Sequence, residues 1–403
     1  MLKITKVSSI ILIIYILFFL QVWGDNHLIL YGSALLVVIS MFAHCVYVGY
    51  INIGNIPFGV LNNLIMVIYA LFAGLFVVNN YLSMLSSLIT YAAFSIICIA
   101  ICYVSSEEGS YDWIHITLIA VAVLCAVYTL LNGSVWEGYG KTLSKSNNPH
   151  AFAAVMYLGI LSSAYLNGTY RMRKTGKYLA LIFLFYYSII ACGSRKYLMA
   201  STCVITVLLI GYLKELWGSS TFNSKLFICI FVLLLFILCI YTYKHVYVHS
   251  QIYTRMHSSD DLGNQNRIRY YRIALKIFRE HPLLGSGYDQ FKHLSGFEGY
   301  SHSTYAEALA DFGGIGCILY FSPIVYLVFV TVYKVYRNRC DYYSLLFLGL
   351  CISELFLGLG QIFFMEFTHF LVWTILFNST RLESRSNVKS TIMNKSNRKY
   401  LRV

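Results

Sequence analysis

The stretch GYSHSTYAEALADFGGIGCILYF, residues 299–321, begins with polar side chains and ends in an apolar run. His302 and Glu307 lie in its polar half, and the apolar half continues to residue 335. An apolar run of about 20 residues is long enough to cross the hydrocarbon core of a membrane as a helix. The stretch therefore predicts a membrane-spanning helix that is preceded by titratable groups at the membrane surface.

Similar apolar runs recur along the chain of 403 residues, which is 58% hydrophobic and only 12% charged. Its mean hydropathy is +0.66. Soluble domains carry about 25% charged residues, so the composition excludes an ordinary soluble protein. We expect an all-α polytopic membrane protein with about twelve transmembrane helices. The expected spans are residues 8–23, 27–48, 60–79, 81–103, 112–131, 150–167, 178–193, 197–213, 226–243, 315–335, 342–358 and 361–378.

The positions of Lys and Arg in short loops predict how these spans are oriented. Residues 169–177, residues 334–341 and the tail from Arg381, with its seven basic residues, are expected in the cytoplasm. Both chain termini then face the cytoplasm. The predicted organisation has four parts: the first nine spans in residues 1–243, a large outer loop in residues 244–302, three further spans in residues 303–378 and a basic tail in residues 379–403.

Three segments on the outer side also carry cations, against this topological trend. They are residues 132–150, residues 192–197 and the large loop of residues 244–302, which holds eight Lys and Arg. Such cations indicate an anionic ligand at the outer face, and phosphate is the obvious candidate. Arg195, in the turn GSRK, has two interpretations. It is either an interfacial residue whose head reaches the lipid headgroups or an arginine that grips a phosphate.

The large loop contains a predicted helix from Arg267 to Glu280, which Pro282 and the glycines after it end in a turn. At helical spacing, Arg267 falls among the apolar positions, where a cation needs a partner, so we expect it to contact the ligand. The neighbouring basic face is either a solvated surface or a headgroup-facing one, and Arg272 is its candidate for an anion contact. The apolar stripe is Ile268, Tyr271, Leu275 and Phe278, and the basic face is Arg269, Arg272, Lys276 and Arg279.

The start of the next helix is marked by Thr304 and Glu307, whose spacing matches a capping box and places the helix start near Tyr305. Glu307 is therefore either a capping residue or a catalytic carboxylate. The glycines at 313, 314 and 316 allow close helix packing. His302 has no such structural explanation. It precedes the helix start, where unpaired N–H groups and the helix dipole favour anions.

Features of a metal or nucleotide site are lacking in the sequence. Asp260 and Asp261 are adjacent, and no Asp-x-Asp pair occurs anywhere. Nearly all of the eleven cysteines fall in apolar runs, which is typical of small buried hydrophobic residues and not of zinc ligands or disulfides. We therefore expect no metal, no cofactor and no nucleic-acid partner.

These motifs, in this order, resemble the O-antigen ligase / O-antigen polymerase (Wzy-like) family of bacterial membrane glycosyltransferases. The resemblance covers about residues 130 to 335. His150 departs from it, because the family often has asparagine there. The matching elements are NPH (148–150), GSR (193–195), the helix led by Arg267 that runs into PLLGSG (282–287), and HSTYAEALADFGGIG (302–316).

The resemblance implies a GT-C-like fold in the bacterial inner membrane, with its large external loop between the ninth and tenth spans. It also implies a donor glycan on undecaprenyl pyrophosphate, with no metal or nucleotide sugar. Arg195 and Arg267 would bind the pyrophosphate, and His302 would take the proton of the acceptor hydroxyl. Lys141 or Lys145 would replace a further arginine of the family. Membrane lipid, a chain-length regulator and a flippase are the other implied partners.

Three functions remain open from the sequence. The first is a polysaccharide repeat-unit polymerase, for O-antigen or capsule, which the resemblance of residues 280–316 favours. The second is an O-antigen ligase that transfers the finished glycan to lipid A–core. The third is a flippase for lipid-linked oligosaccharides, which is disfavoured because the predicted spans are almost free of charge apart from Glu354 and Glu366 near the last outward turn.

Overall fold

The fold is helical throughout the part of the chain that the structure describes. This computed structural model describes residues 56–78, 81–105, 111–131, 149–169, 171–219, 261–297, 299–338 and 341–381, and a few positions between 32 and 39. Those residues form helices and turns, with no strand among them. The expected all-α class is therefore confirmed for them. The expected spans 8–23 and 226–243, most of the span 27–48, and the tail from 382 lie outside the described residues.

The helices match most of the apolar runs to within a few residues. Their bounds are α3 (Phe58–Val77), α4 (Tyr81–Ser105), α5 (Tyr111–Leu131), α6 (Pro149–Thr169), α7 (Arg171–Cys192), α8 (Arg195–Ser219), α11 (Asp261–Glu280), α12 (Phe291–Leu294), α13 (Thr304–Arg337), α14 (Tyr342–Leu357) and the 3-10 helix η3 (Phe363–Met365). A last helix follows at residues 367–381.

Five of the described helices are long and apolar enough to cross a membrane: α3, α4, α5, α6 and α13. Shorter apolar helices lie at Gly176–Cys192 and Tyr342–Leu357. The chain is therefore an integral membrane protein by its helices, while the total of about twelve spans stays a prediction. One expected boundary is wrong, because the helix placed at 361–378 begins only at residue 367, after η3. The span placed at 315–335 lies within α13, whose start at Thr304 confirms the helix start expected near Tyr305.

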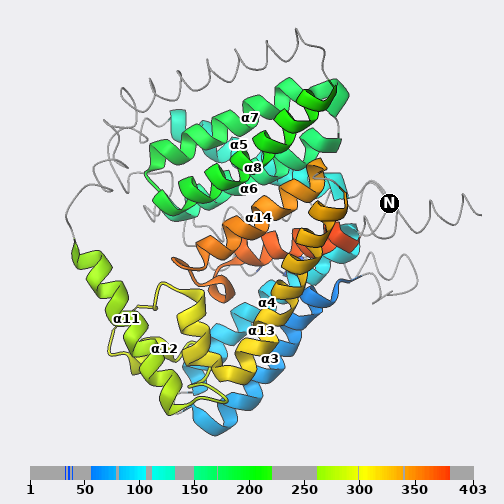
Figure 1. Ribbon diagram of the computed structural model, residues 1–403. Helices are drawn as coiled ribbons and strands as arrows, with labels where there is room; N and C mark the ends of the chain where they lie inside the picture. The colour runs from blue at the N-terminus through cyan, green and yellow to red at the C-terminus, as the bar shows by residue number, and fades with distance from the viewer. Residues whose placement is uncertain are drawn as a thin grey trace, which may run out of the picture.

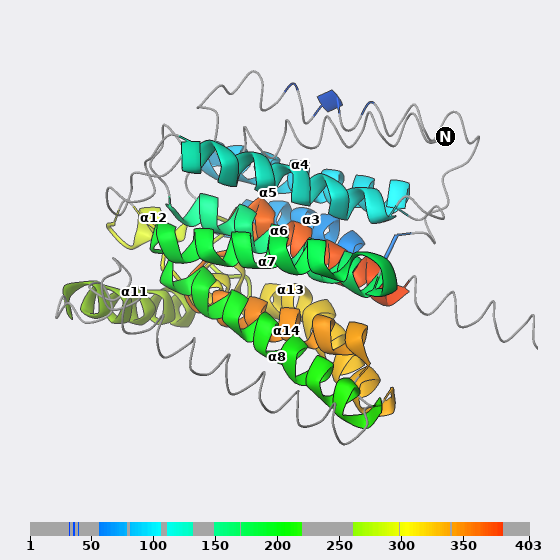
Figure 2. The same ribbon diagram turned by 90° about the horizontal axis from the view of Figure 1, so that it is seen from above.

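The helices form two groups that share one core (Figure 1). Helix α6 packs between α5 and α7, and α8 packs against α14, while α3, α4 and α13 form the second group. The helix at residues 367–381 runs between the groups, roughly alongside its neighbours when seen from above (Figure 2). Its side chain Phe370 meets Tyr91 and Phe94 of α4, with ring centroids 5.0 and 5.5 Å apart. Burial of these aromatic rings joins the last helix to the second group.

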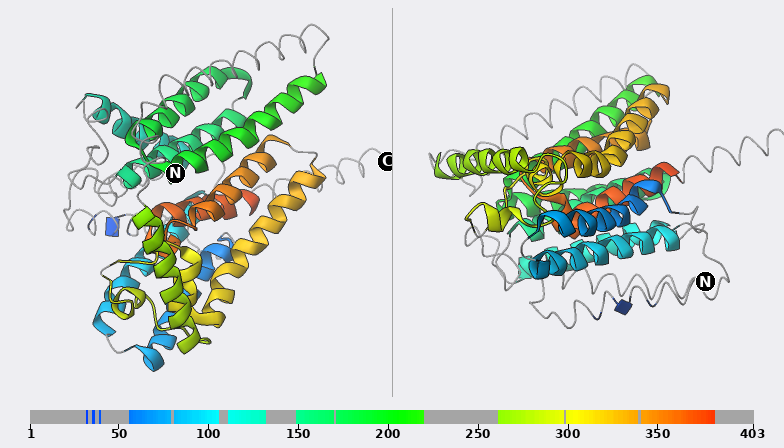
Figure 3. Two further views of the ribbon diagram at one scale, coloured as in Figure 1. Left: turned by 60° about the vertical axis from the view of Figure 1, so that its left-hand side comes forward. Right: turned by 90° about the horizontal axis from the view of Figure 1, so that it is seen from below.

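Helices α11 and α12 lie together at one end of the bundle (Figures 1 and 3). The expected apolar stripe on α11 is partly wrong, since Ile268 and Leu275 are 51% and 44% exposed. The buried positions are Ala274 and Ile277, with Tyr270 and Ile273 partly buried beside them. This stripe is rotated because α11 packs on α13 and on Phe291, so the face centred on Ala274 is the one that is covered.

A backbone contact fastens the turn after α11 to α13. Gly313 has φ 65 and ψ −169, a kink inside α13, and Gly285 has φ 74. A Cβ atom on Gly285 would lie 2.3 Å from the Asp311 carbonyl oxygen, and one on Gly313 would lie 2.4 Å from the Gly285 nitrogen. The kink frees backbone N–H groups of α13 from their helical partners, and these groups bond across the contact instead: Gly314 N–H donates to Pro282 O at 2.8 Å. The glycines thus allow a loop, as well as a helix, to approach closely.

We expect Gly285→Ala to destabilise the protein strongly, because the new methyl group meets backbone atoms that have no room to move. Gly296→Ala is the matched control. Gly296 also has a positive φ of 71, but nothing lies within 4 Å of its Cβ position. The control should be less stable by only about 1 kcal/mol, which is the cost of the backbone strain. Thermal unfolding of the purified protein in detergent compares the two variants. Equal losses would show that the close contact at Gly285 does not matter.

Candidate functional site

The polar start of α13 is built by hydrogen bonds that the sequence pattern did not predict. Ser303 is the N-cap and accepts from Ala306 N–H, while Thr304 is already inside the helix and donates its N–H to Gly358 O and Gln361 O at 2.9 Å each. The expected capping box between Thr304 and Glu307 is therefore wrong. Glu307 is buried, 1% exposed, and accepts instead from the N–H of Ser301 at 2.5 Å.

His302 has an unusual backbone conformation. Its φ is 60, and Asp289 is the only other described residue besides glycine with a positive φ. A left-handed conformation costs an L-residue about 1 to 2 kcal/mol, and such strain clusters at functional sites. The two neighbours of His302 hold it in place, since the Ser301 hydroxyl donates to Ser303 O at 3.0 Å while Glu307 binds the Ser301 N–H. The strained loop therefore presents a half-buried imidazole.

The imidazole of His302 lies among aromatic rings and cations. The centroid of its ring is 4.5 Å from the ring centroid of Tyr300 and 6.1 Å from that of Tyr270 on α11. Burial lowers the pKa of His302, and the positive charges of Arg267 and Lys196 lower it further. An imidazole with a lowered pKa is neutral near pH 7 and can accept a proton. The site thus holds a neutral base beside two cations.

Lys196 was not among the residues expected from the sequence. It follows Arg195 in the first turn of α8, and burial lowers the pKa of its ammonium to about 8, with Glu366 opposing this effect and Arg267 adding to it. Arg195 is half-buried beside it. The turn is fixed from α6, because the Nδ1 atom of His150 lies 3.0 Å from the buried hydroxyl of Ser194. His150 therefore joins the first two motifs, NPH and GSR, in space.

Glu366, after η3, supplies the negative charge that these cations face. Burial raises the pKa of its carboxyl, but a hydrogen bond and charge from His369, and the charges of Lys196 and His150, outweigh burial and lower that pKa overall. Gln361 donates to both carboxylate oxygens, at 3.1 and 2.9 Å. Glu366 is thus an ionised carboxylate in a cluster of cations. The signal in the sequence was its place in the last polar turn before an apolar run.

A buried hydrogen-bond network centred on His369 lies next to Glu366. His369 is 1% exposed, and its Nδ1 atom is 2.7 Å from an oxygen of Glu354 while its Nε2 atom is 2.9 Å from the side-chain oxygen of Gln361. Both ring nitrogens therefore face acceptors, and each can donate only if the ring carries both protons. This arrangement fixes the orientation of Gln361 and, through it, the carboxylate of Glu366.

The structure thus gathers some of the expected residues and separates others. Arg267, at the exposed face of α11, and His302 are close enough for the charge of one to act on the other, and Lys196 joins them. Arg272 is exposed one further turn along α11. Lys141 and Lys145 lie outside the described residues. Within the described ranges, no group of three or more His, Cys, Asp or Glu is placed to hold a metal ion.

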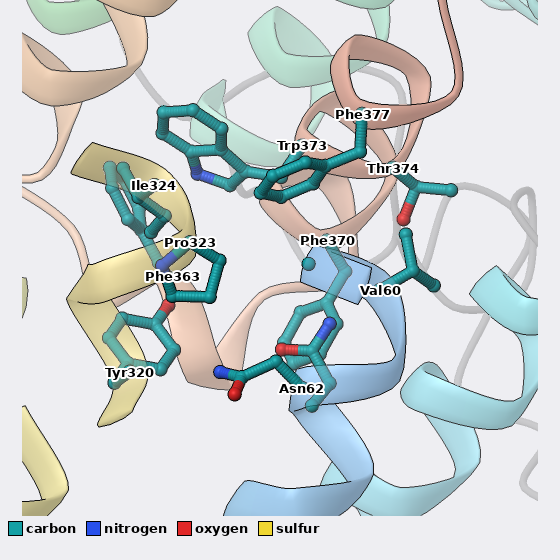
Figure 4. Close-up of a pocket in the computed structure, with 12 residues that line it drawn as sticks. Val60, Asn62, Tyr320, Pro323, Ile324, Phe363, Phe370, Trp373, Thr374 and Phe377 are labelled. Atoms are coloured by element: carbon teal, nitrogen blue, oxygen red, sulfur yellow. The ribbon is translucent and has the colours of Figure 1, made fainter. Parts of the chain in front are cut away.

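A small, largely apolar cavity of about 20 Å³ lies away from this cluster, between α3, α13 and the last helix (Figure 4). Asn62, Tyr320 and Trp373 are among the side chains that line it, with Phe370 and Phe377. None of the cations around His302 contributes to its wall. The cavity therefore belongs to the packing of the membrane-embedded helices and not to the polar site.

A comparison with protein families agrees with the motifs. A family model described as O-antigen ligase matches residues 179–321. No curated protein matches the chain. The matched segment contains Arg195, Lys196, Arg267 and His302, and it ends within α13. The segment around the cation cluster is therefore similar to the O-antigen ligase family model, which is consistent with the O-antigen ligase/polymerase family of membrane glycosyltransferase-like enzymes.

Proposed function

We propose that the chain is a polysaccharide repeat-unit polymerase that transfers a glycan from undecaprenyl pyrophosphate onto a lipid-linked acceptor. The observation that carries the proposal is the strained, half-buried His302, whose pKa is lowered by burial and by the neighbouring cations Arg267 and Lys196. The match to the O-antigen ligase family supports a lipid-linked glycan as substrate. The reaction then takes place at the outer face of the bacterial inner membrane, with residues 244–302 outside and both termini in the cytoplasm.

In the proposed reaction, the acceptor hydroxyl attacks the anomeric carbon of the donor glycan. The bond from that carbon to the pyrophosphate oxygen breaks, and the electron pair leaves with the pyrophosphate on its lipid. His302 takes the hydroxyl proton, which a positioned base accelerates by about 10² to 10⁴-fold. Arg195 and Arg267 balance the charge that develops on the leaving group. Neither step requires a metal ion, since the cations of the chain supply the positive charge.

The remaining expected site residues take supporting roles in this proposal. Glu307 is a positioning residue, because its carboxylate holds the Ser301 N–H and so the strained backbone of His302. Lys196 lowers the pKa of His302 and adds positive charge to the pyrophosphate site. Arg272 and Lys145 are assigned to peripheral attraction of the anionic donor, which is weak for exposed charges at physiological salt.

Arg267→Ala and His302→Ala should each abolish chain elongation, because one removes leaving-group stabilisation and the other removes the base. We expect a loss of about 100-fold or more in each case. Gel analysis of the surface glycan measures polymer length, and the amount of protein in the membrane is measured in parallel. Arg272→Ala, on the exposed face of the same helix, is the matched control and should be mild. Normal polymer in both site variants refutes the assignment.

The pH dependence offers a second test, because only neutral His302 can accept the proton. The rate should rise with pH through the pKa of His302, which lies below the usual value of about 6.5, and then stay level. Lys196→Met removes a nearby positive charge, so the pKa of His302 should rise and the acidic limb should move to higher pH. Lys276→Met, on the exposed surface of α11, should leave the limb unmoved. An unmoved limb in the Lys196 variant contradicts the electrostatic role.

The second candidate function is an O-antigen ligase, which the description of the matching family favours. It shares the donor chemistry and differs in the acceptor, which would be lipid A–core. Deletion of the gene separates the two. We expect the deletion strain of a polymerase to carry single capped repeats, whereas a ligase deletion leaves long polymer on the lipid carrier. Gel analysis of surface and lipid-linked glycans distinguishes these outcomes.

A further inference from the structure

A second pocket lies beside the cation cluster and contributes no residue to it. It has a volume of about 310 Å³ and is partly open to solvent, and it lies between α4, the turn before α12, Tyr300 and η3. This volume is at the lower end of the range of about 300 to 1,000 Å³ that is typical of small-ligand sites. Its wall combines aromatic rings with hydroxyl and charged groups, which is the chemistry of a site with few, well-placed polar contacts.

The polar end of the pocket is a turn that several hydrogen bonds hold in place. Asp289, with φ 58, is 7% exposed, and its carboxylate accepts from the Ser87 hydroxyl and from the Lys292 ammonium. The turn is fastened to α13, because Asp311 accepts from the N–H groups of Asp289 and Phe291, at 2.9 and 3.1 Å. A strained turn that is held this firmly is typical of a functional site.

The other walls are aromatic. Phe94, Tyr288 and Phe364 are at most 3% exposed and form the base, and the Tyr288 hydroxyl donates to Phe364 O at 2.9 Å, which fixes its ring. Tyr300 is 40% exposed and closes the side next to the cation cluster. Aromatic faces beside hydroxyl, carboxylate and ammonium groups suit a pyranose, which has apolar C–H faces and a rim of hydroxyls.

The pocket also shares a wall with the candidate base. The ring of Tyr300 lines the pocket and lies 4.5 Å from the ring of His302. The cations Arg267 and Lys196, which act on His302 from α11 and α8, do not line the pocket. A hydroxyl held in the pocket would therefore approach His302 from the Tyr300 side, separate from the group held by the cations.

We propose that this pocket binds the terminal sugar of the acceptor glycan, with Ser87, Asp289 and Lys292 contacting its hydroxyls and Tyr300 packing against its face. The inference rests on the proposed glycosyl transfer, for which it specifies where the acceptor lies. The cations around His302 then serve the donor pyrophosphate, so the two substrates occupy different sides of one imidazole. No bond is made or broken in the pocket itself.

Filling the pocket tests the proposal. Thr90 lines it from α4, and its hydroxyl bonds only to the backbone oxygen of Ser86 within the described part of the chain, so Thr90→Trp fills the space without breaking the Asp289 turn. Ser86→Trp is the matched control, one turn earlier on α4 and exposed. Elongation is measured with lipid-linked repeat units extracted from the deletion strain. Donor-site integrity is measured as binding of undecaprenyl pyrophosphate to the purified protein.

We expect Thr90→Trp to lose about tenfold or more in elongation, an effect of at least about 1.4 kcal/mol, with undecaprenyl pyrophosphate binding unchanged and the control normal in both. Normal elongation in Thr90→Trp overturns the acceptor pocket. If Arg267→Ala still abolishes elongation, the proposed transfer stands without the pocket, and if it does not, the transfer itself is refuted. Should Thr90→Trp fail to accumulate, Lys292→Gln decides: weaker elongation with intact pyrophosphate binding supports the pocket, and normal elongation overturns it.

Discussion

The turn after α11 can lie against α13 only because two glycines face each other there. Gly285 and Gly313 bring their backbones so close that a methyl group on either would overlap main-chain atoms of the other segment. Hydrogen bonds replace the side-chain packing that is missing, with Ser286 N–H donating to Ala310 O at 2.8 Å and Gly287 N–H donating to Asp311 O at 3.0 Å. The contact positions the residues between the turn and the start of α13, which include the strained residues Asp289 and His302.

The second constraint is the electrostatic balance of the cation cluster. A chain with so few charged residues nonetheless collects Lys196, Arg267 and Glu366 at one end of its helices. Cations in a partly buried site raise the free energy of one another, and an ionised carboxylate offsets that cost. His369 and Gln361 keep the carboxylate in place from below. The carboxylate offsets only part of the positive charge, so the site keeps a net attraction for anions. Burial and the charges of Arg267 and Lys196 together lower the pKa of His302 in this site.

Hydropathy predicted most helices, because a run such as residues 81–103 has one stable arrangement in lipid. Hydropathy did not predict the helix bounds where apolar residues are surrounded by protein instead of lipid. Residues 361–366 form a turn and the 3-10 helix η3 although several of them are apolar, so the last helix begins later than the apolar run. Of the candidate site, His302 was found because no structural role explained its position. Arg267 was found for a reason that is wrong, because it was placed on a buried apolar face and is exposed on α11 together with Ile268. Lys196 and Glu366 were missed, because their importance arises from contacts between segments that are distant in sequence. The only local signal was the place of Glu366 in the last polar turn before an apolar run.

The two strained residues are tied to the same helix by two acidic side chains. Glu307 holds the loop of His302 and Asp311 holds the turn of Asp289. They are one helical turn apart on α13, about 6 Å along its axis. The spacing of these two residues on α13 therefore sets the distance between the proposed acceptor pocket and His302. If both proposals hold, that distance selects which hydroxyl of the acceptor sugar reaches the imidazole, so backbone geometry as well as sugar contacts would determine the regiochemistry of the glycosidic bond.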